Sequence, residues 1–395
     1  MSMKKLKEIL EKPELKVIGL MSGTSADGMD AALTEISGSG TRIRVRQKSF
    51  VSLPYPDEIR NEILRLAGGT EGGSRDLCLF TFLMGQLGLE ACRAVCEKAG
   101  IAPEEVDLVG SHGQTLFHQP EPVEYVGRQV RGTLQLGEAS VIAEGMGCPV
   151  VSDFRTRDFA AGGQGAPLVP YAEYLLYRRE DEHVGLQNIG GIGNLTLLPA
   201  GGRPEDTLAF DTGPGNMVMD QITERITGGR RRYDAEGRLA ASGKWSRELL
   251  DWMLSDPWLQ MKPPKSTGRE VYGAAYTDTL TEKARELGIG DTDLLATATR
   301  FTAECIALAV RNFCPVKPAR LIIGGGGSRN PTLLRDIREA TGLPVMTNED
   351  LGFDSEAKEA VAFAVMASEC IRQQCNNMPS VTGAKHPVVM GKISL

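Results

Sequence analysis

The sequence has little cysteine or histidine arranged for metal binding. Its eight cysteines are scattered without a CxxC pair, and its four histidines form no local cluster that would complete a zinc site. Cys92 and Cys96 lie one helical turn apart, a spacing that favours packing in a core over metal binding. We therefore expect the thiols to be reduced.

The chain also lacks an excess of positive charge and lacks long apolar runs. The net charge is −7 at pH 7, which argues against a broad surface for nucleic acid or anionic membrane and favours small-molecule partners. Residues 1–15 carry charges throughout, and no run approaches the roughly 20 apolar residues of a membrane span. These absences predict a cytoplasmic protein that binds neither nucleic acid nor membrane.

No proline-rich linker or low-complexity segment divides the chain. A single hydrophobic core stops growing near roughly 250–300 residues, so a chain of 395 residues predicts two domains, here of the α/β class. The motifs described below place the expected division near residue 150. The first domain would cover residues 1–150, with 375–395 packing back on it, and the second would cover 151–374.

Residues 210–216 place one carboxylate, Asp211, directly after an apolar run and before a turn of glycine and proline. Gly213 and Gly215 allow backbone angles that other residues resist, and Pro214 cannot continue a ladder, so a short strand is predicted to end here. Asp211 would then lie at the carboxyl end of a strand, where α/β folds bind ligands, and it is a candidate general base. The alternative is that it caps the helix predicted next.

Two glycine-rich hairpins join apolar strands, one early in each half of the chain. Residues 22–28 separate predicted strands at 16–21 and 29–36, a third strand over 42–50 completes an antiparallel set, and the pattern returns at 184–198. Their backbone N–H groups, with the hydroxyl groups of the first hairpin, are free to meet an anion. Together the hairpins would hold a triphosphate, although the first alone also suits a plain surface turn.

A third glycine-rich stretch follows the predicted buried strand at residues 320–323. Four glycines, 324–327, precede Ser328, and a helix is predicted over 332–339. Only glycine lets a backbone approach a ligand so closely, so this stretch suits a nucleotide's base and ribose or phosphate. Its spacing fits neither the dinucleotide fingerprint nor the P-loop, which predicts a nucleotide site of another kind.

Polar residues at 111–115, after a predicted strand at 107–110, are candidates for sugar binding. They include His112, which is either a general acid–base group or a structural histidine. Gln114 can both donate and accept hydrogen bonds, which makes it a candidate ligand for sugar hydroxyls.

Residues 153–158 carry two aspartates and two arginines ahead of a glycine-rich turn at 160–170, a composition typical of a substrate-pocket rim. Arg155 and Arg157 could hold a carboxylate bidentately, and the alternative is a salt-bridge network at a domain joint. Glu359 interrupts an apolar stretch in the helix predicted over 356–373. It either lies at a helix start or points into a cleft.

Together these stretches resemble the family of anhydro-N-acetylmuramic acid kinases, within the actin, Hsp70 and sugar-kinase superfamily. The resemblance runs from about residue 16 to the end and rests on residues 19–28, 110–115, 153–155, 162–170, 210–216 and 265–270. Ala26 stands where the family commonly has leucine, and residues 1–15 extend beyond the usual start.

The resemblance implies a two-domain actin-like ATPase (ribonuclease H-like) fold with an interdomain active-site cleft. It implies an ATP-dependent kinase that uses Mg²⁺ and water to open 1,6-anhydro-N-acetylmuramic acid and phosphorylates O6. The products would be N-acetylmuramic acid 6-phosphate and ADP, in peptidoglycan recycling and amino-sugar catabolism. A homodimer is expected.

The residues and the resemblance together predict three sets of site residues. Asp211 is the expected catalytic base. The residues expected to bind the nucleotide are Gly23, Thr24, Ser25, Asp27, Gly28, Asp30, Gly190, Gly191, Asn194, Gly325, Gly326 and Ser328. Those expected to bind the sugar are Gln114, Arg155, Gln164 and Glu359. The metal ligands stay open, with Asp27 and Asp30 as candidates.

Two other functions fit parts of the pattern. An ordinary sugar kinase would phosphorylate a hydroxyl without opening a ring. An Hsp70-like nucleotide-gated binding module would need a further peptide-binding domain, for which 395 residues leave little room.

Overall fold

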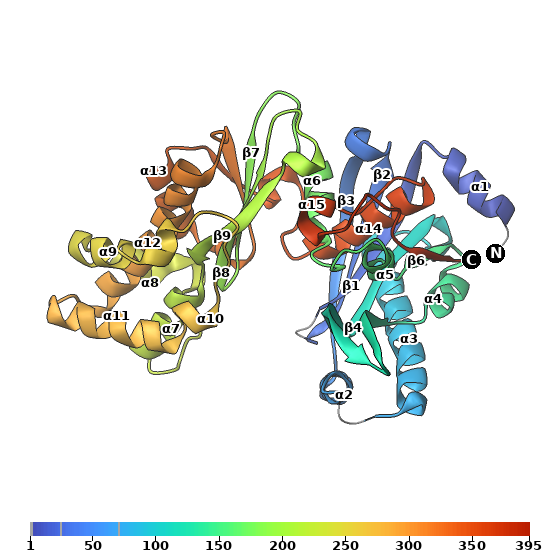
Figure 1. The fold of residues 1–395 in the computed structure, drawn as a ribbon, viewed down its shortest axis with the longest axis horizontal. Coiled ribbons are helices and arrows are strands. Elements are labelled where there is room, and N and C mark those ends of the chain that lie inside the picture. Colours follow the sequence, from blue (N-terminus) through green and yellow to red (C-terminus); the bar gives the residue numbers. More distant parts are fainter. Residues whose placement is uncertain (1–2, 24–25, 70–71) are drawn as a thin grey trace. The chain divides into compact units, whose positions relative to one another are not determined.

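The structure, a computed structural model, describes residues 3–23, 26–69 and 72–395 (Figure 1). The chain forms two compact units. The first combines Met1–Leu176 with Gly352–Leu395, and the second is Tyr177–Leu351.

These units differ from the domain bounds expected near residues 150 and 374. Strand β6 (Val150–Ser152) lies inside the first sheet, because it pairs with β4 (Leu108–Tyr125) on one side and with β12 (Lys392–Ser394) on the other. Helix α14 (Lys358–Ile371) also belongs to the first unit. The second unit is therefore a continuous insertion in the first.

The first sheet begins with the three antiparallel strands that the sequence predicts, β1 (Glu14–Ser22), β2 (Gly28–Ser37) and β3 (Arg44–Pro54). The sheet order is β3-β2-β1-β4-β6-β12, and β4 and β6 run parallel to β1. The parallel strands bring the polar residues of β1 and β4 to neighbouring positions.

The second sheet repeats this order. Three antiparallel strands, β7 (Val184–Ile189), β8 (Ile192–Leu198) and β9 (Leu208–Pro214), are followed by β10 (Arg320–Gly324) and β11 (Val345–Thr347), which run parallel to β7. The order is β9-β8-β7-β10-β11. Two sheets of the same topology confirm the predicted two-domain α/β fold of the actin-like type.

Helices cover both faces of the first sheet. Ile18 and Leu20 of β1 join the core formed with α3 (Ser74–Ala99) and α4 (Ala139–Met146). Gly19 points to the opposite face, because side chains alternate along a strand, and there it meets α14. The other helices of this unit are α1 (Met3–Glu11), α2 (Asp57–Ala67), α5 (Arg155–Ala160), α6 (Val169–Tyr177) and α15 (Pro379–Thr382).

Helix α3 is the one helix of the described residues that is long and apolar enough to cross a membrane, by length and composition alone. The sequence analysis expected none. Phe80, Met84, Cys92 and Cys96 of α3 lie in the first unit's core. The prediction that Cys92 and Cys96 pack in a core is confirmed, and all eight cysteines are free thiols.

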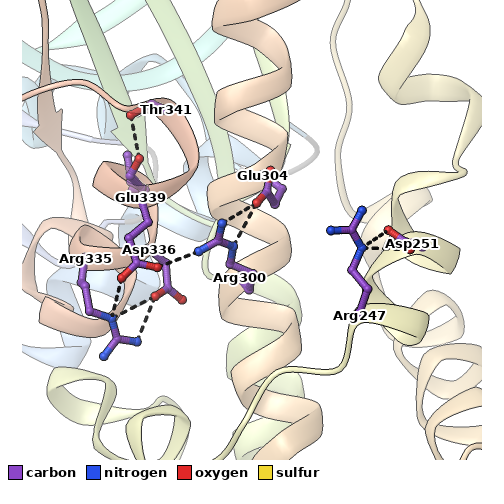
Figure 2. Close-up of polar contacts among 9 residues, drawn as sticks. Arg247, Asp251, Arg300, Glu304, Arg335, Asp336, Glu339 and Thr341 are labelled. Carbon is purple, nitrogen blue, oxygen red and sulfur yellow. Dashed lines mark hydrogen bonds and ion pairs between the residues drawn. The ribbon is translucent and has the colours of Figure 1, made fainter.

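The second unit is built around α12 (Asp291–Phe313), which is buried along most of its length and packs against α13 (Pro331–Thr341). Figure 2 shows that Arg300 of α12 pairs with Glu304 of the same helix and also reaches Glu339 of α13, which joins the two helices. Because α13 follows the glycine stretch, these contacts help to fix that stretch. The other helices are α7 (Met217–Ile226), α8 (Arg238–Ser242), α9 (Arg247–Leu254), α10 (Arg269–Tyr272) and α11 (Ala274–Glu286).

Strand β4 is longer than predicted and forms a ribbon with β5 (Arg128–Leu136). The sequence predicted strands only at 107–110 and 133–136, because the polar stretch between them, with Pro120 and Pro122, lacks apolar alternation. The pairing accommodates it with a register shift between Gln119 and Val123. Residues 111–115 therefore lie within a strand and do not follow one.

The contact between β1 and α14 yields a stability prediction. An added Cβ at Gly19 would lie 1.8 Å from the Ala360 carbonyl oxygen, so Gly19→Ala must separate the helix from the sheet. We expect a loss of about 1–3 kcal/mol or more in the free energy of unfolding. Gly132→Ala is the matched control, because its Cβ would meet nothing within 4 Å. Denaturant titration measures the free energy of unfolding of both variants. Equal values would contradict the prediction and show that the helix can shift freely.

Candidate functional site

The β7–β8 hairpin of the second unit packs directly on the turn that follows β9. The Gly190 carbonyl accepts a hydrogen bond from the Asn216 N–H at 2.7 Å, and the Gly191 carbonyl accepts one from the Gly215 N–H at 2.9 Å. A Cβ on Gly215 would lie 2.3 Å from the Gly190 oxygen, so only glycine fits at that position. The two predicted motifs thus form one backbone structure.

The glycine stretch after β10 joins the same edge of the sheet. Gly325 has a φ of +76°, and its Cβ would lie 2.7 Å from the Ile189 carbonyl oxygen. The Ser328 hydroxyl donates to the Gly325 carbonyl at 2.8 Å, and the Asn216 amide donates to Ile189 at 3.2 Å. Both glycine motifs of this unit, including Gly190, Gly191, Gly325, Gly326 and Ser328, therefore lie together.

A pocket of about 360 Å³ opens beside this glycine stretch. It is lined by Asn216, Met219, Asp220, Arg232, Tyr233, Asp234, Glu236, Gly326, Arg329 and Asn330. Burial raises the pKa of Asp220 to about 6. The volume lies in the range of small-ligand sites, and the mixture of aromatic and charged groups suits a nucleoside.

The sequence analysis missed most of this lining. It gave no site role to the arginine run at 230–232 or to Asp220. Asp220 lies one helical turn after Asn216 on α7, a spacing that puts both on one face of the helix. That spacing is the signal that could have identified it.

Asp211 is the fourth of the seven residues of β9, so the prediction that it ends a strand is wrong. It lies opposite Asn194, while Gly213 lies opposite Gly193, so β9 carries one extra residue at Thr212. Such a β-bulge bends the strand and redirects a side chain. The bulge gives Asp211 the exposure that the sequence analysis attributed to a strand end.

Asp211 is held by the loop that precedes α10. Its Oδ2 accepts a hydrogen bond from the Thr267 N–H at 2.9 Å, and its own N–H donates to the Lys265 carbonyl at 3.2 Å. Helix α7 takes Asn216 as its N-cap, so Asp211 does not cap that helix. Among the residues that the structure describes, Oδ1 of Asp211 accepts no hydrogen bond.

The first-unit hairpin is braced from within. Thr24 and Ser25 lie outside the described residues, and Gly23 accepts a hydrogen bond from the Gln114 amide at 3.1 Å. Gln114 is fully buried, and its Oε1 lies 2.6 Å from the Ser22 hydroxyl. Its amide also donates to the Thr115 carbonyl. Both N–H groups of the Gln114 amide therefore donate within the protein, and among the described residues Gln114 supports the hairpin.

Acidic groups gather beside that hairpin. Asp30 is half-buried; burial raises its pKa, the Ser52 hydroxyl lowers it, and the carboxylates of Asp27, Glu356 and Asp354 raise it. In the described part of the chain, no group of three or more His, Cys, Asp or Glu residues is arranged to hold a metal ion. Gly28 begins β2, where a Cβ would lie 2.6 Å from the Leu53 carbonyl oxygen.

Arg155 and His112 form a buried pair in the first unit. Arg155 Nε and Nη2 lie 3.1 and 2.8 Å from His112 Nε2, and Nη1 donates to the Gly165 carbonyl at 2.6 Å. His112 Nδ1 lies 2.7 Å from the Gly113 carbonyl, which assigns the proton to Nδ1. Burial and the Arg155 charge lower the pKa of His112 to about 3. The His112 imidazole is therefore neutral at physiological pH.

The Asp and Arg residues at 153–158 do not pair with one another. Asp158 is fully buried and accepts hydrogen bonds from Asn377, Thr382 and the Gly165 N–H. Asp153 pairs with Lys392. The predicted Asp/Arg salt-bridge network is absent among these residues, and hydrogen bonds hold the glycine turn instead.

Gln164 and Glu359 are the exposed members of the predicted sugar-binding set. The Gln164 amide donates to Glu121 Oε1 at 3.2 Å. Glu359 lies in the first turn of α14. Partial desolvation of its carboxyl group raises its pKa, the charges of Lys358 and Arg155 lower that pKa, and the charge of Asp30 raises it. Glu359 therefore lies near the hairpin acids and near the His112–Arg155 pair.

Comparison with solved structures gives remote likenesses. Component A of (R)-2-hydroxyglutaryl-CoA dehydratase from Acidaminococcus fermentans has 14% identity and a TM-score of 0.41, and the match covers 91% of this chain and 99% of that one. An ROK hexokinase from Thermus thermophilus has 15% identity and a TM-score of 0.36, with coverage of 91% and 99%.

Comparison of sequences gives much stronger matches. Residues 15–395 match the protein family described as anhydro-N-acetylmuramic acid kinase. The kinase of that name from Caldanaerobacter subterraneus subsp. tengcongensis is 51% identical over 100% of both chains. The one from Clostridioides difficile is 43% identical over 95% of this chain and 97% of its own.

The His112–Arg155 pair predicts an NMR titration. The His112 imidazole should stay neutral from pH 8 down to about pH 4, since its pKa is lowered to about 3. Arg155→Ala removes a positive neighbour, so the pKa of His112 should rise. The exposed His386 provides the control signal, which should not move between the two proteins. A His112 signal that titrates near its usual pKa in the unaltered protein would contradict the buried pair.

Proposed function

Because the chain belongs to the anhydro-N-acetylmuramic acid kinase family, and is therefore a kinase that uses ATP and a small sugar substrate, we propose that it opens the sugar ring hydrolytically as it phosphorylates it. The substrate is 1,6-anhydro-N-acetylmuramic acid. The products are N-acetylmuramic acid 6-phosphate and ADP.

The observation that carries this proposal is the hydrogen bonding of the two Asp211 carboxylate oxygens. One carboxylate oxygen is fixed by the Thr267 N–H, while among the described residues the other oxygen accepts no hydrogen bond. Burial raises the pKa of Asp211, and the Thr267 N–H and the Lys265 charge lower it. A carboxylate with one fixed and one available oxygen is suited to orient a water molecule and take its proton.

In this proposal the second unit binds the nucleotide. Gly190, Gly191 and Asn194 of the hairpin are assigned to the phosphates, with the Gly191 N–H as the proposed backbone donor, because the Gly190 N–H already donates to the Ile192 carbonyl at 3.2 Å. Gly325, Gly326 and Ser328 receive the adenosine, with the adjacent pocket around Asp220 holding its far end. The pocket is continuous with the glycine stretch through Gly326, which supports this orientation.

The first-unit hairpin meets the phosphates from its own unit, through Gly23, Gly28 and the neighbouring residues. Mg²⁺ is usually held by one or two carboxylates together with substrate phosphates, and Asp27 and Asp30 offer carboxylates of that kind. Bound there, the ion would neutralise charge on the phosphoryl oxygens.

The sugar-binding role rests on the first unit's exposed groups. Gln164 and Glu359 present an amide and a carboxylate to solvent. Arg155 has its guanidinium donors directed to His112 and Gly165, so we propose that it orients the glycine turn that carries Gln164. Gln114 supports the hairpin in the same indirect way.

The reaction then requires one proton transfer to protein. Asp211 takes a proton from the water that attacks the anomeric carbon, the bond from that carbon to the bridging oxygen breaks, and the oxygen bonds to the γ-phosphorus as ADP leaves. Atoms balance with one water consumed. We further propose that the protein works in the cytoplasm as a homodimer, in cell-wall recycling, without nucleic-acid or membrane partners.

Solvent oxygen tests the ring opening. The reaction is run in heavy-oxygen water and stopped at once with borohydride, which fixes the oxygen at the anomeric carbon before exchange. Mass spectrometry should find one heavy oxygen in the sugar product. A separate incubation of finished product measures exchange. A phosphorylated product that keeps its anhydro bridge would show an ordinary sugar kinase instead.

Asp211→Asn tests the base. Asparagine keeps the size and the Thr267 contact but accepts no proton, so turnover should fall by roughly 10²–10⁴-fold. Affinity for an ATP analogue should change little, because the nucleotide is assigned to the glycine motifs. Asp153→Asn, which alters an aspartate paired with Lys392 in the first unit, is a comparison variant. Near-normal turnover of Asp211→Asn would refute the base role.

A further inference from the structure

Lys265 is a buried cation in the second unit. Its residue is 8% exposed, and its Nζ donates to the Leu259 carbonyl at 3.1 Å. Nζ also lies 4.3 Å from the centre of the Trp258 ring and 4.5 Å from that of Phe313. Aromatic faces stabilise a cation that has left water, so these contacts fix the ammonium in place.

Trp258 holds the same loop at a second point. Its Nε1–H donates to the Ser266 carbonyl at 3.2 Å, directly after Lys265. Its own N–H donates to Asp256 Oδ1 at 2.9 Å, and Asp256 Oδ2 accepts from the Tyr272 hydroxyl at 3.0 Å. The side chain of Lys265 and the backbone after it are thus fixed to one structure.

This fixed loop is the one that holds Asp211. The Lys265 carbonyl accepts from the Asp211 N–H at 3.2 Å, and two residues later the Thr267 N–H donates to Asp211 Oδ2 at 2.9 Å. A displacement of the loop would release both bonds together. The geometry of Asp211 therefore depends on the position of Lys265.

Few charged groups act on Lys265 and Asp211. Three groups face Lys265: Cys305, Asp211 and Asp256. Burial lowers the pKa of Lys265, and these three groups raise it. Lys265 is in turn the one charged side chain, within the described part of the chain, that acts on Asp211. Burial raises the pKa of Asp211, and the Thr267 N–H and Lys265 oppose that rise.

We propose that Lys265 is a positioning residue for the reaction, which holds residues 265–267 against Asp211 so that Oδ2 stays occupied and Oδ1 faces the attacking water. The positive charge of Lys265 also keeps the carboxylate ionised in its partly buried place. This rests on the proposed role of Asp211 as the base.

Lys265→Met tests the charge, because methionine has a similar length and packs well against aromatic rings. The pKa of Asp211 is measured by carbon NMR of protein labelled at aspartate, with Asp211→Asn to assign the signal, and turnover is measured against pH. The pKa should rise by about one unit, since an opposite charge is lost. As the pH is lowered, Lys265→Met should therefore lose turnover at a pH about one unit higher than the unaltered protein does. Lys262→Met, at an exposed lysine of the same loop, should change neither.

Trp258→Leu tests the positioning, because it keeps the charge and removes the bond to Ser266. Turnover should fall at every pH, while affinity for an ATP analogue is kept. Unchanged turnover in this variant, or an unchanged Asp211 pKa in folded Lys265→Met, would overturn the proposal. A raised Asp211 pKa with an unmoved pH profile would uphold the action of Lys265 on Asp211 and refute the base role of Asp211.

Discussion

The second unit depends on one close approach of backbone to backbone, that of Gly215 to the carbonyl of Gly190. No side chain fits between them, so the hairpin and the turn after β9 move as one body. The same turn supplies Asn216, whose amide reaches Ile189 beside the glycine stretch. A single steric constraint therefore holds the β7–β8 hairpin, the glycine stretch after β10 and the strand that carries Asp211 in one frame.

Polar burial supports the first unit in a different way. Gln114, His112, Arg155 and Asp158 use their hydrogen-bonding groups on other protein groups. Each buried polar atom that finds a partner avoids a desolvation cost of about 1–3 kcal/mol, so these side chains also fix the loops that they contact. These four side chains therefore hold loops of the first unit in place, including the turn that carries Gln164.

The sequence predicted most of the fold, because glycine turns, apolar strands and helix starts are local signals. It identified the two hairpins, the glycine stretch and Asp211, and the comparisons confirm the family. It could not show that Asp211 sits at a bulge, because the extra residue is defined only by pairing with β8. It could not decide whether Gln114 binds the sugar or supports the hairpin, because both roles use the same side-chain amide. It placed the unit boundary too early, because β6 belongs to the first unit only through its pairing with β4 and β12, which the sequence does not show.

The insertion of the second unit has a consequence for synthesis on the ribosome. Residues 177–351 are continuous, so this unit can complete its sheet and its core as soon as they emerge. The first unit cannot, because Gly19 and Gly110 on its sheet are covered by α14, which ends at Ile371, and β12 closes the sheet only at Ser394. The part of the first unit that is translated first must therefore wait, with one face of its sheet uncovered, until α14 and β12 have been translated after the whole second unit.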